Sequence, residues 1–324
     1  MKERLFLIGG GGFIGKNLVR CLHEKYAISI FDKFIDEAYF AQYPEVKKTL
    51  MELDKEQISA DVESPDYIIN LASIVTAERD LGLFDSMIAS NLKVLLNLYD
   101  RFKDDKQLKL FVQFGSSEEY GNDGSPFAET MREEPNSPYA LVKQLTTNTA
   151  MMLYRNYKFP IMVVRPGNLF GPLQGKAKFI PYVIDSLKKG EALNVTPCEQ
   201  KRDFIYADDF AWAIGKLLEH YTKAVGEIVN VSSGESISLK DIIEDCRKAT
   251  DSESQVNYGA LPYRENEIMD LRCSVAKLEN IIRKEIKFDT RMRLKEMVAI
   301  LNGGGKFALF NPFVAFAGSI NIAA

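Results

Sequence analysis

Apolar runs alternate with amphipathic segments along the first half of the chain. Short apolar runs are typical of buried parallel strands, and apolar residues that recur every three or four positions predict helices. The expected strands are Leu5–Ile8, Ala27–Phe31, Leu50–Leu53, Tyr67–Ser73, Leu108–Gly115 and Ile161–Asn168, and the expected helices are Lys16–Glu24, Leu83–Phe102 and Tyr139–Tyr157. This alternation predicts an α/β fold with a doubly wound parallel (Rossmann) sheet, whose ligands lie at the carboxyl ends of the strands.

The alternation weakens after residue 170, where shorter elements and loops take over. There the pattern predicts helices over Phe179–Leu187 and Ala207–Tyr221 and a strand over Glu227–Val231, whereas the earlier segment Glu37–Tyr43 resembles a polar excursion. We expect a first domain over residues 1–170, to which some later segments return, and a smaller discontinuous C-terminal lobe over residues 171–301. Residues 302–324 form an apolar tail with almost no charge and no predicted role.

The composition mainly argues against certain classes of protein and partner. With 46% hydrophobic residues, 27% charged residues and a formal net charge of -4, the chain resembles an ordinary globular protein without a nucleic-acid or membrane partner. No apolar segment reaches membrane-spanning length. The four cysteines are far apart and no signal peptide is apparent, so we expect reduced thiols and a cytoplasmic location. Neither His23 nor His220 has a Cys or His at ligand spacing, so no metal site is expected.

A glycine-rich turn follows the first expected strand. Gly9, Gly12 and Gly15 have the GxxGxxG spacing, and a helix follows them. Strand, glycine turn and helix form the context in which such spacing indicates dinucleotide binding. Gly9 would permit a tight turn, Gly12 would let backbone approach a pyrophosphate, and Gly15 would let the helix pack on the strand, with the phosphates at the helix N-terminus.

The second expected strand ends on Asp32. An acidic side chain at this position can accept hydrogen bonds from the adenosine ribose and would repel a 2′-phosphate. The sequence therefore predicts NAD rather than NADP as cofactor. Asp54, after the third expected strand, is a further candidate for the adenine side.

Three residues are candidates for acid–base chemistry on a hydroxyl group. Tyr139 and Lys143 are four apart and share a helix face, so the ammonium can lower the pKa of the phenol and can also hold the nicotinamide ribose. Ser116 ends the preceding strand and would hydrogen-bond the oxygen that Tyr139 deprotonates. Glu118 is a candidate second acid or base, although a solvated turn carboxylate explains it as well.

Several motifs occur in one order along the chain. They are GxxGxxG with Phe13-Ile14, Asn70-Leu71-Ala72, Ser116-Ser117-Glu118-x-Tyr120-Gly121, Ser137-Pro138-Tyr139-x-x-x-Lys143, Arg165-Pro-Gly-Asn-Leu-Phe-Gly-Pro172 and Arg202-Asp203-Phe204. Together they resemble the extended short-chain dehydrogenase/reductase family, and in particular its nucleotide-sugar epimerases, dehydratases, decarboxylases and 4-ketoreductases. The resemblance covers residues 4 to 285, and the conjunction of motifs is specific.

The resemblance implies a set of site residues. Ser116, Tyr139 and Lys143 would form the catalytic triad, with Glu118 beside them. The expected cofactor contacts are Gly9, Gly12, Phe13, Ile14, Gly15, Asp32, Leu71, Ala72, Asn91 and Lys143. Asn168, Phe179, Arg202 and Arg264 would lie around a nucleoside-diphosphate sugar, and arginines suit phosphates because they make bidentate contacts. A homodimer through two helices, one bearing Tyr139, is also implied.

The segment from Phe179 to Glu267 is also similar to the CDP-abequose and CDP-paratose synthases, which are 4-ketoreductases. Asp32 departs from that branch, since a reductase that releases its cofactor at each turnover more often takes NADPH. The Ser116-Ser117-Glu118 pattern is closer to the epimerases, dehydratases and decarboxylases. We therefore predict an NAD-dependent nucleotide-sugar epimerase or dehydratase that acts through transient oxidation at the sugar 4-position. The alternatives are an NAD(P)H-dependent 4-ketoreductase and a non-catalytic NAD-sensing protein.

Overall fold

A large parallel sheet forms the centre of the computed structural model, which describes residues 1–75, 80–122 and 124–302. Its strands are β1 (Arg4–Ile8), β2 (Ala27–Asp32), β3 (Lys47–Leu50), β4 (Tyr67–Asn70), β5 (Leu110–Phe114), β6 (Ile161–Pro166) and β11 (Ile228–Val231). The spatial order is β3-β2-β1-β4-β5-β6-β11, and neighbouring strands are parallel. The order reverses between β1 and β4, so the predicted doubly wound α/β fold is confirmed.

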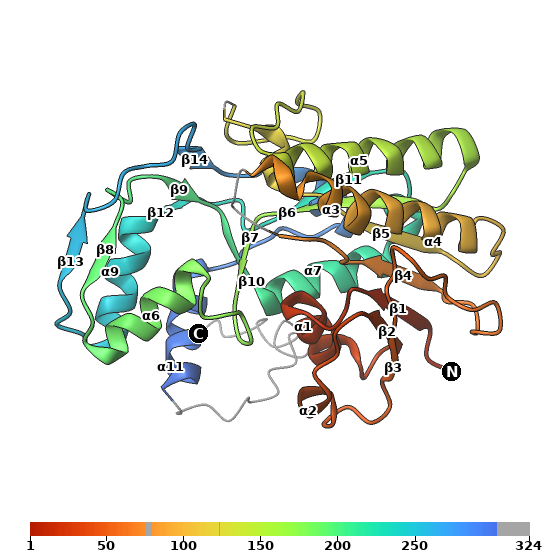
Figure 1. Ribbon diagram of the computed structural model, residues 1–324, viewed down its shortest axis with the longest axis horizontal. Helices are drawn as coiled ribbons and strands as arrows, with labels where there is room; N and C mark the ends of the chain where they lie inside the picture. Colours follow the sequence, from red (N-terminus) through yellow and green to blue (C-terminus); the bar gives the residue numbers. More distant parts are fainter. Residues whose placement is uncertain (76–79, 123, 303–324) are drawn as a thin grey trace, which may run out of the picture.

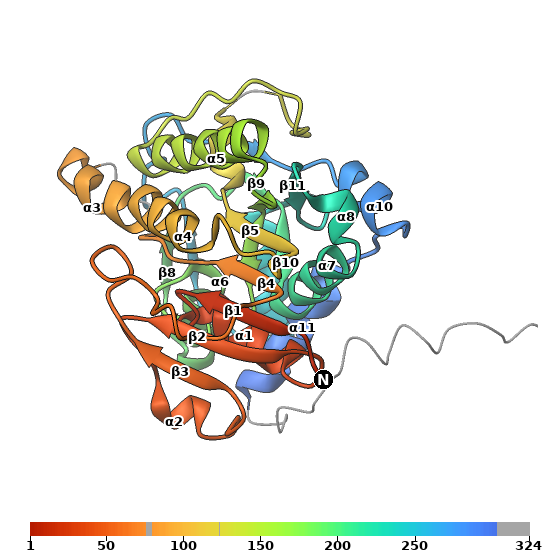
Figure 2. The same ribbon diagram turned by 90° about the vertical axis from the view of Figure 1, so that its right-hand side faces the viewer.

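Helices cover both faces of this sheet (Figures 1 and 2). Because alternate strand residues point to opposite faces, Leu5 and Leu7 of β1 join one apolar cluster and Phe6 and Ile8 join another. The first cluster includes residues of α1 (Phe13–Leu22), α7 (Ala207–Glu219) and α10 (Ala276–Ile282), and the second includes residues of α4 (Val94–Phe102) and α5 (Pro138–Tyr157). The sheet is therefore buried on both sides, as its apolar strands predicted.

A smaller lobe lies beside the sheet, on the left in Figure 1. Its helices are α6 (Phe179–Lys189), α9 (Leu239–Thr250) and α11 (Thr290–Leu301), which share an apolar cluster. Its short strands are β7 (Asn168–Phe170), β8 (Leu193–Val195), β9 (Lys201–Arg202), β10 (Phe204–Tyr206), β12 (Ile237–Ser238), β13 (Val256–Tyr258) and β14 (Asp270–Leu271). They pair in three small sheets, β10-β7, β12-β9-β14 and β13-β8.

Several elements differ from the sequence prediction. The third strand is Lys47–Leu50 instead of Leu50–Leu53, and the fourth ends at Asn70. The expected polar excursion contains the short helix α2 (Glu37–Phe40), whose start is capped by Asp36, because the Asp36 side chain accepts a hydrogen bond from the backbone N–H of Tyr39. Two further short elements are η3 (Ser117–Tyr120) and α8 (Tyr221–Ala224). Of the expected tail over residues 302–324, residues 303–324 lie outside the described residues.

The expected helix from Leu83 to Phe102 is built from four consecutive pieces. These are η1 (Leu81–Leu83), α3 (Phe84–Ile88), the π-helical η2 (Ala89–Lys93) and α4. This run of 22 residues, with a mean hydropathy of 1.2, is by length and composition able to cross a membrane, which the sequence reading had missed. Part of it packs in the second core cluster, through Val94, Leu95 and Leu98.

Candidate active site

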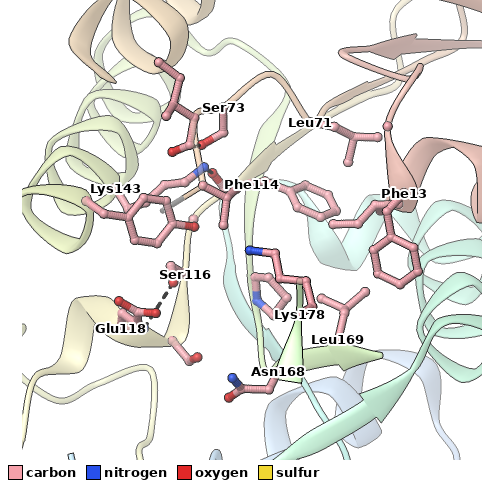
Figure 3. Close-up of a pocket in the computed structure, with 18 of the residues that line it drawn as sticks. Phe13, Leu71, Ser73, Phe114, Ser116, Glu118, Lys143, Asn168, Leu169 and Lys178 are labelled. Atoms are coloured by element: carbon pink, nitrogen blue, oxygen red, sulfur yellow. Dashed lines mark hydrogen bonds between the residues drawn. The ribbon is translucent and has the colours of Figure 1, made fainter. Parts of the chain in front are cut away.

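A cavity of about 990 Å³ lies at the carboxyl ends of the central strands and extends to the lobe. The residues that line it follow β1, β4, β5 and β6 in the chain, and others come from the lobe helix α6 and the segment before β14. Figure 3 shows Phe13 and Leu71 on the right of this space, Ser116, Glu118 and Lys143 on the left, and Lys178 near the centre of the view with Asn168 below it. The fold thus brings together sequence segments that are far apart.

The glycine turn has the shape of a phosphate cradle. Gly9 has a φ of +70°, and a Cβ atom there would lie 2.7 Å from the backbone nitrogen of Ala72, so the tight turn requires glycine. A Cβ at Gly12 would meet nothing within 4 Å, so its backbone faces open space, and α1 begins there without a side-chain cap. A Cβ at Gly15 would lie 2.1 Å from the carbonyl oxygen of Gly10, so Gly15 makes room for the backbone of the turn, whereas we expected it to make room for the strand.

These features fit a dinucleotide. An uncapped helix start offers free N–H groups and a positive dipole end to a pyrophosphate. Phe13, Ile14, Leu71 and Ala72 line the adjoining wall. Asp32 lines the cavity at the end of β2, where one carboxylate oxygen accepts from Gly11 N–H at 2.8 Å and the other from Phe34 N–H at 3.2 Å. Each oxygen keeps a lone pair for a ribose hydroxyl.

Asn91 does not reach the cavity, contrary to the sequence prediction. It is fully buried in the π-helical segment, where its Nδ2 donates to the Met87 carbonyl at 2.9 Å. The widened turn of that segment sets the direction of its side chain, and helical periodicity alone could not show this. Its neighbours Ser90 and Val94 line the cavity instead. Asp54, which was considered for the adenine side, is also part of the lining.

The predicted triad meets at one point of the cavity. Tyr139 lies in the first turn of α5, which Ser137 caps by accepting from Ala140 N–H at 3.1 Å, with Pro138 as the first helical residue. Lys143 lies one turn later, with its Nζ 5.8 Å from the Tyr139 ring centroid and 3.0 Å from the Phe114 carbonyl oxygen to which it donates. Both side chains are buried, and Ser116 faces them from the end of β5.

Burial moves the two titratable groups of the triad in opposite directions. It raises the pKa of the Tyr139 phenol, and the Glu118 carboxylate acts in the same direction while a hydrogen bond with the Ser116 hydroxyl opposes both. It lowers the pKa of the Lys143 ammonium to about 8, against the attraction of Glu119. We expected Lys143 to lower the pKa of Tyr139. Without bound ligands, the loss of solvation is the largest effect on Tyr139, and the pKa of its phenol is raised instead.

Glu118 lines the cavity and is half-buried. Its backbone N–H donates to the Ser116 hydroxyl at 3.2 Å. Burial lowers the pKa of Arg202, and Glu267 and Glu118 both raise it. The Glu118 carboxylate therefore acts electrostatically both on Tyr139 of the triad and on Arg202 of the lobe.

Cationic side chains gather at the lobe end of the cavity. Arg202, Arg264 and Lys178 line it, together with Asn168 and Phe179. Arg202 is partly engaged, since it forms an ion pair with Glu267 and Nη1 donates to the carbonyls of Lys201 at 2.8 Å and Ile268 at 2.6 Å. Arg264 is exposed and Lys178 precedes the first turn of α6, where no side chain caps the helix. This end of the cavity suits an anion.

Sequence reasoning missed three residues at or beneath the site. Lys178 and Glu267 line the cavity, and Glu119 lies fully buried under Ser116. A signal for Glu119 was present, because Ser116 and Glu119 have the Ser-x-x-Glu spacing of a capping box and form one in η3. Within the described ranges, no group of three or more His, Cys, Asp or Glu side chains is placed to hold a metal ion.

Comparison with known proteins gives concordant results. The chain is 27% identical over 283 residues to the CDP-abequose synthase of Salmonella muenchen, with 87% of this chain and 92% of that one covered. It is 25% identical over 319 residues to the UDP-N-acetyl-alpha-D-glucosaminuronate decarboxylase of Bacillus cytotoxicus, with 92% and 97% covered. The UDP-glucuronic acid 4-epimerase of Bacillus cereus, solved with UDP-glucuronic acid and NAD, shares the fold at a TM-score of 0.85 and 21% identity, over 93% of this chain and 100% of that one.

The family-level comparison agrees with these individual similarities. Residues 5–232 match the NAD dependent epimerase/dehydratase family. That match spans well over half of the 324 residues and includes the glycine turn, the triad and the strand order described above. The chain therefore belongs to the NAD-dependent epimerase/dehydratase family, within the extended short-chain dehydrogenases/reductases that its motifs resemble.

Proposed function

We propose that the protein is an NAD-dependent epimerase or dehydratase that acts on a nucleoside-diphosphate sugar through transient oxidation at the sugar 4-position. One observation carries the proposal: Ser116, Tyr139 and Lys143 open onto the same cavity as the glycine cradle and the cationic lobe residues. A cofactor and a diphosphate sugar bound at the two ends would meet at the triad. The names of the similar proteins, which refer to CDP-, UDP- and GDP-sugars, support the substrate class.

The residues divide the chemistry between them. NAD, when bound, supplies the hydride acceptor. Tyr139 takes the proton of the sugar 4-hydroxyl, Ser116 hydrogen-bonds the same oxygen, and Lys143 supplies positive charge that stabilises the phenolate. Because burial raises the pKa of Tyr139 in the protein alone, this positive charge is needed at the moment of proton transfer.

Glu118 is the proposed acid or base for any step after the 4-keto sugar is formed. It lines the same cavity as the triad and acts electrostatically on Tyr139 and Arg202. Asn168, Phe179, Arg202 and Arg264 are the proposed contacts to the nucleoside diphosphate, with Lys178 added from the structure. The products of such enzymes are precursors of deoxysugars or surface polysaccharides.

A 4-ketoreductase with the same triad is the second candidate, and the similarity to CDP-abequose synthase favours it. The two candidates differ in how they use the cofactor. Steady-state consumption of added NADH or NADPH with a 4-keto sugar nucleotide would indicate the reductase. Turnover with bound NAD and no net consumption would indicate the epimerase or dehydratase, which the carboxylate of Asp32 at the ribose end favours.

The substitution Tyr139→Phe tests the assignment. It removes the proton acceptor and leaves the cradle intact, so turnover of the accepted nucleotide sugar should fall by about two orders of magnitude or more with NAD binding retained. A thermal-shift panel of nucleotide sugars followed by product NMR would identify the substrate.

Tyr26→Phe is the matched control for this test, since Tyr26 is a buried tyrosine of the core away from the cavity. Unchanged turnover in Tyr139→Phe would remove Tyr139 from the mechanism. NAD binding without turnover of any nucleotide sugar in the wild type would favour a cofactor-sensing protein instead.

We also infer a homodimer that forms through α4 and α5, which lie side by side on one face of the molecule (Figures 1 and 2). The support is a group of exposed leucines on these helices: Leu96 is 42% exposed, Leu141 38% and Leu145 40%. Leu141 and Leu145 are one turn apart and therefore share a face. Apolar side chains in this arrangement are typical of a contact with another chain.

A further inference from the structure

A carboxylate lies buried directly beneath the proposed catalytic serine. Glu119 has no exposed surface, and its two oxygens receive four hydrogen bonds. Oε1 accepts from the backbone N–H of Ser116 at 2.7 Å and from the Thr147 hydroxyl at 3.1 Å, and Oε2 accepts from Arg165 Nε at 3.0 Å and Nη2 at 2.7 Å. Burial raises the pKa of Glu119, but three of its four hydrogen bonds come from the Arg165 guanidinium and the Ser116 N–H, which can only donate, so we assign the ionised form.

Glu119 connects the end of β5 to the helix that carries the triad. Tyr139, Lys143 and Thr147 succeed one another at intervals of four residues and so form one stripe on α5. Tyr139 contacts Ser116, Lys143 donates to the Phe114 carbonyl at 3.0 Å, and Thr147 donates to Glu119. Three successive turns of α5 are therefore attached to the segment from Phe114 to Glu119.

Gly115 shows how closely the two elements approach. A Cβ atom there would lie 2.4 Å from Glu119 Oε1 and 3.0 Å from the Thr147 hydroxyl oxygen. The contact between carboxylate and hydroxyl thus occupies the space that any side chain at residue 115 would need. The carboxylate fills this junction, and a displacement of it would move the backbone of Ser116 directly.

Arg165 of β6 fixes the carboxylate from the other side. Its side chain is fully buried, its guanidinium lies 4.6 Å above the Tyr120 ring, and Nη2 also donates to Glu133 at 2.6 Å. Glu133 belongs to the loop that precedes α5. Arg165 of β6 therefore links the segment from Phe114 to Glu119 to the loop that precedes α5.

We propose that Glu119 is a positioning residue of this active site: held by Arg165, it fixes the backbone of Ser116 against α5 and places a compensating negative charge beneath Lys143. The proposal rests on the proposed function, because it assigns a role toward the Ser116–Tyr139–Lys143 triad. It differs from the role of Glu118, whose carboxylate lines the cavity, since Glu119 has no access to a substrate.

The charge of Glu119 acts on Lys143 among several other groups. Arg165 on β6, Tyr120 and Glu118 on η3, Tyr139 on α5 and Glu133 in the preceding loop surround the same region. Burial lowers the pKa of Lys143, and the negative charge of Glu119 opposes this shift. Neutralising it should therefore release that proton at a lower pH.

The test uses two variants. Glu119→Leu with Arg165→Met replaces the ion pair by apolar side chains, an exchange that proteins often tolerate, and removes the acceptor of Ser116. We expect kcat to fall by about tenfold or more with KM changed by less than about threefold, because the lost contact orients a reacting group. Glu119→Gln keeps one acceptor and removes the charge, and we expect the alkaline limb of its kcat–pH profile to move to lower pH.

Asp209→Asn is the matched control. Asp209 accepts from Arg293 Nε at 2.9 Å in a second buried pair, and Arg293 Nη1 also donates to Glu296 at 2.8 Å, but this cluster does not line the cavity. It should lower the melting temperature much as Glu119→Gln does and leave kcat and its pH profile unchanged. If Glu119→Gln and the folded double variant both lower the melting temperature and leave kcat and its pH profile unchanged, as expected for Asp209→Asn, Glu119 is only structural.

Hydrogen–deuterium exchange of the peptide that contains Ser116 separates this outcome from a failure of the proposed function. Exchange at Ser116 should accelerate in the double variant and stay unchanged in Asp209→Asn, whether or not a substrate has been found. Unchanged exchange would overturn the proposal by itself. Faster exchange in a protein that turns over no nucleotide sugar would instead retain the contact and reject the reaction.

Discussion

At the scale of single residues, the site depends on two buried groups whose charged forms are both disfavoured. Burial raises the pKa of Tyr139 and lowers that of Lys143 to about 8, so the two pKa values, similar in water, move apart and the neutral phenol and neutral amine are both favoured. In a buried site, where water screens charges weakly, the protonation of each group responds to the neighbouring charges. Glu118 above and Glu119 below are therefore electrostatic partners of the pair as much as neighbours of Ser116.

This coupling predicts an alkaline limit to activity. Lys143 carries its charge below its lowered pKa and loses it as the pH rises through about 8, and the phenolate of Tyr139 then loses a stabilising cation. We expect kcat at saturating substrate to fall above about pH 8. The measurement is a kcat–pH profile with stability checked at each pH, and a kcat that still rises at about pH 9 would contradict the role of Lys143.

At the scale of elements, two kinds of segment were predicted best from the sequence: strands that are buried on both faces, and helices whose start is marked by a capping residue. The strands around the glycine turn and the helix after Ser137-Pro138 are of this kind. The edge strand β3 was shifted because its residues are mostly exposed, with Leu50 65% exposed, and only pairing with β2 sets its position. The place of Asn91 depends on a π-helical turn, which no local pattern encodes. The Ser-x-x-Glu spacing could have indicated the contact of Glu119 with Ser116, but its pairing with Arg165 of β6 is a contact across elements that no local pattern shows.

The exposed leucines of α4 and α5 lead to a prediction about assembly. Leu141→Glu with Leu145→Glu would place charges in the proposed dimer contact, so we expect the dimer to dissociate. Size-exclusion chromatography with light scattering measures the mass directly. Leu50→Glu with Met292→Glu, two exposed apolar residues on β3 and α11, is the control that should leave the mass unchanged. A wild-type monomer, or a dimer that survives the first pair, would reject this interface.

At the scale of the whole molecule, one cavity is lined by both the large sheet and the lobe. The uncapped start of α1 suits one diphosphate, and the cations near the start of α6 suit another. The family resemblance indicated both, but Lys178 became visible only in the structure. If the glycine turn binds NAD and the lobe binds the nucleotide sugar, substitutions at one end of the cavity should change the affinity for one ligand and leave the other unchanged.

Lys178→Ala with Arg264→Ala should separate these affinities. Removing two charge-assisted contacts should weaken binding of UDP or CDP by about tenfold or more, and binding of NAD should change by less than about twofold. Isothermal titration measures both. Lys189→Ala, at the other end of α6, removes a similar charge away from the cavity and serves as control. Equal losses for both ligands would show that the two ends are not separate sites.

The path of the chain between sheet and lobe has a consequence for engineering. After β10 the chain returns to the sheet as α7 and β11, enters the lobe again as β12 and α9, and alternates once more through α10 and α11. A lobe from a relative with another sugar specificity therefore cannot be grafted at a single junction. Recombination between such relatives would need several coordinated crossovers, so changes of specificity are more accessible through substitutions in the cavity lining than through exchange of whole modules.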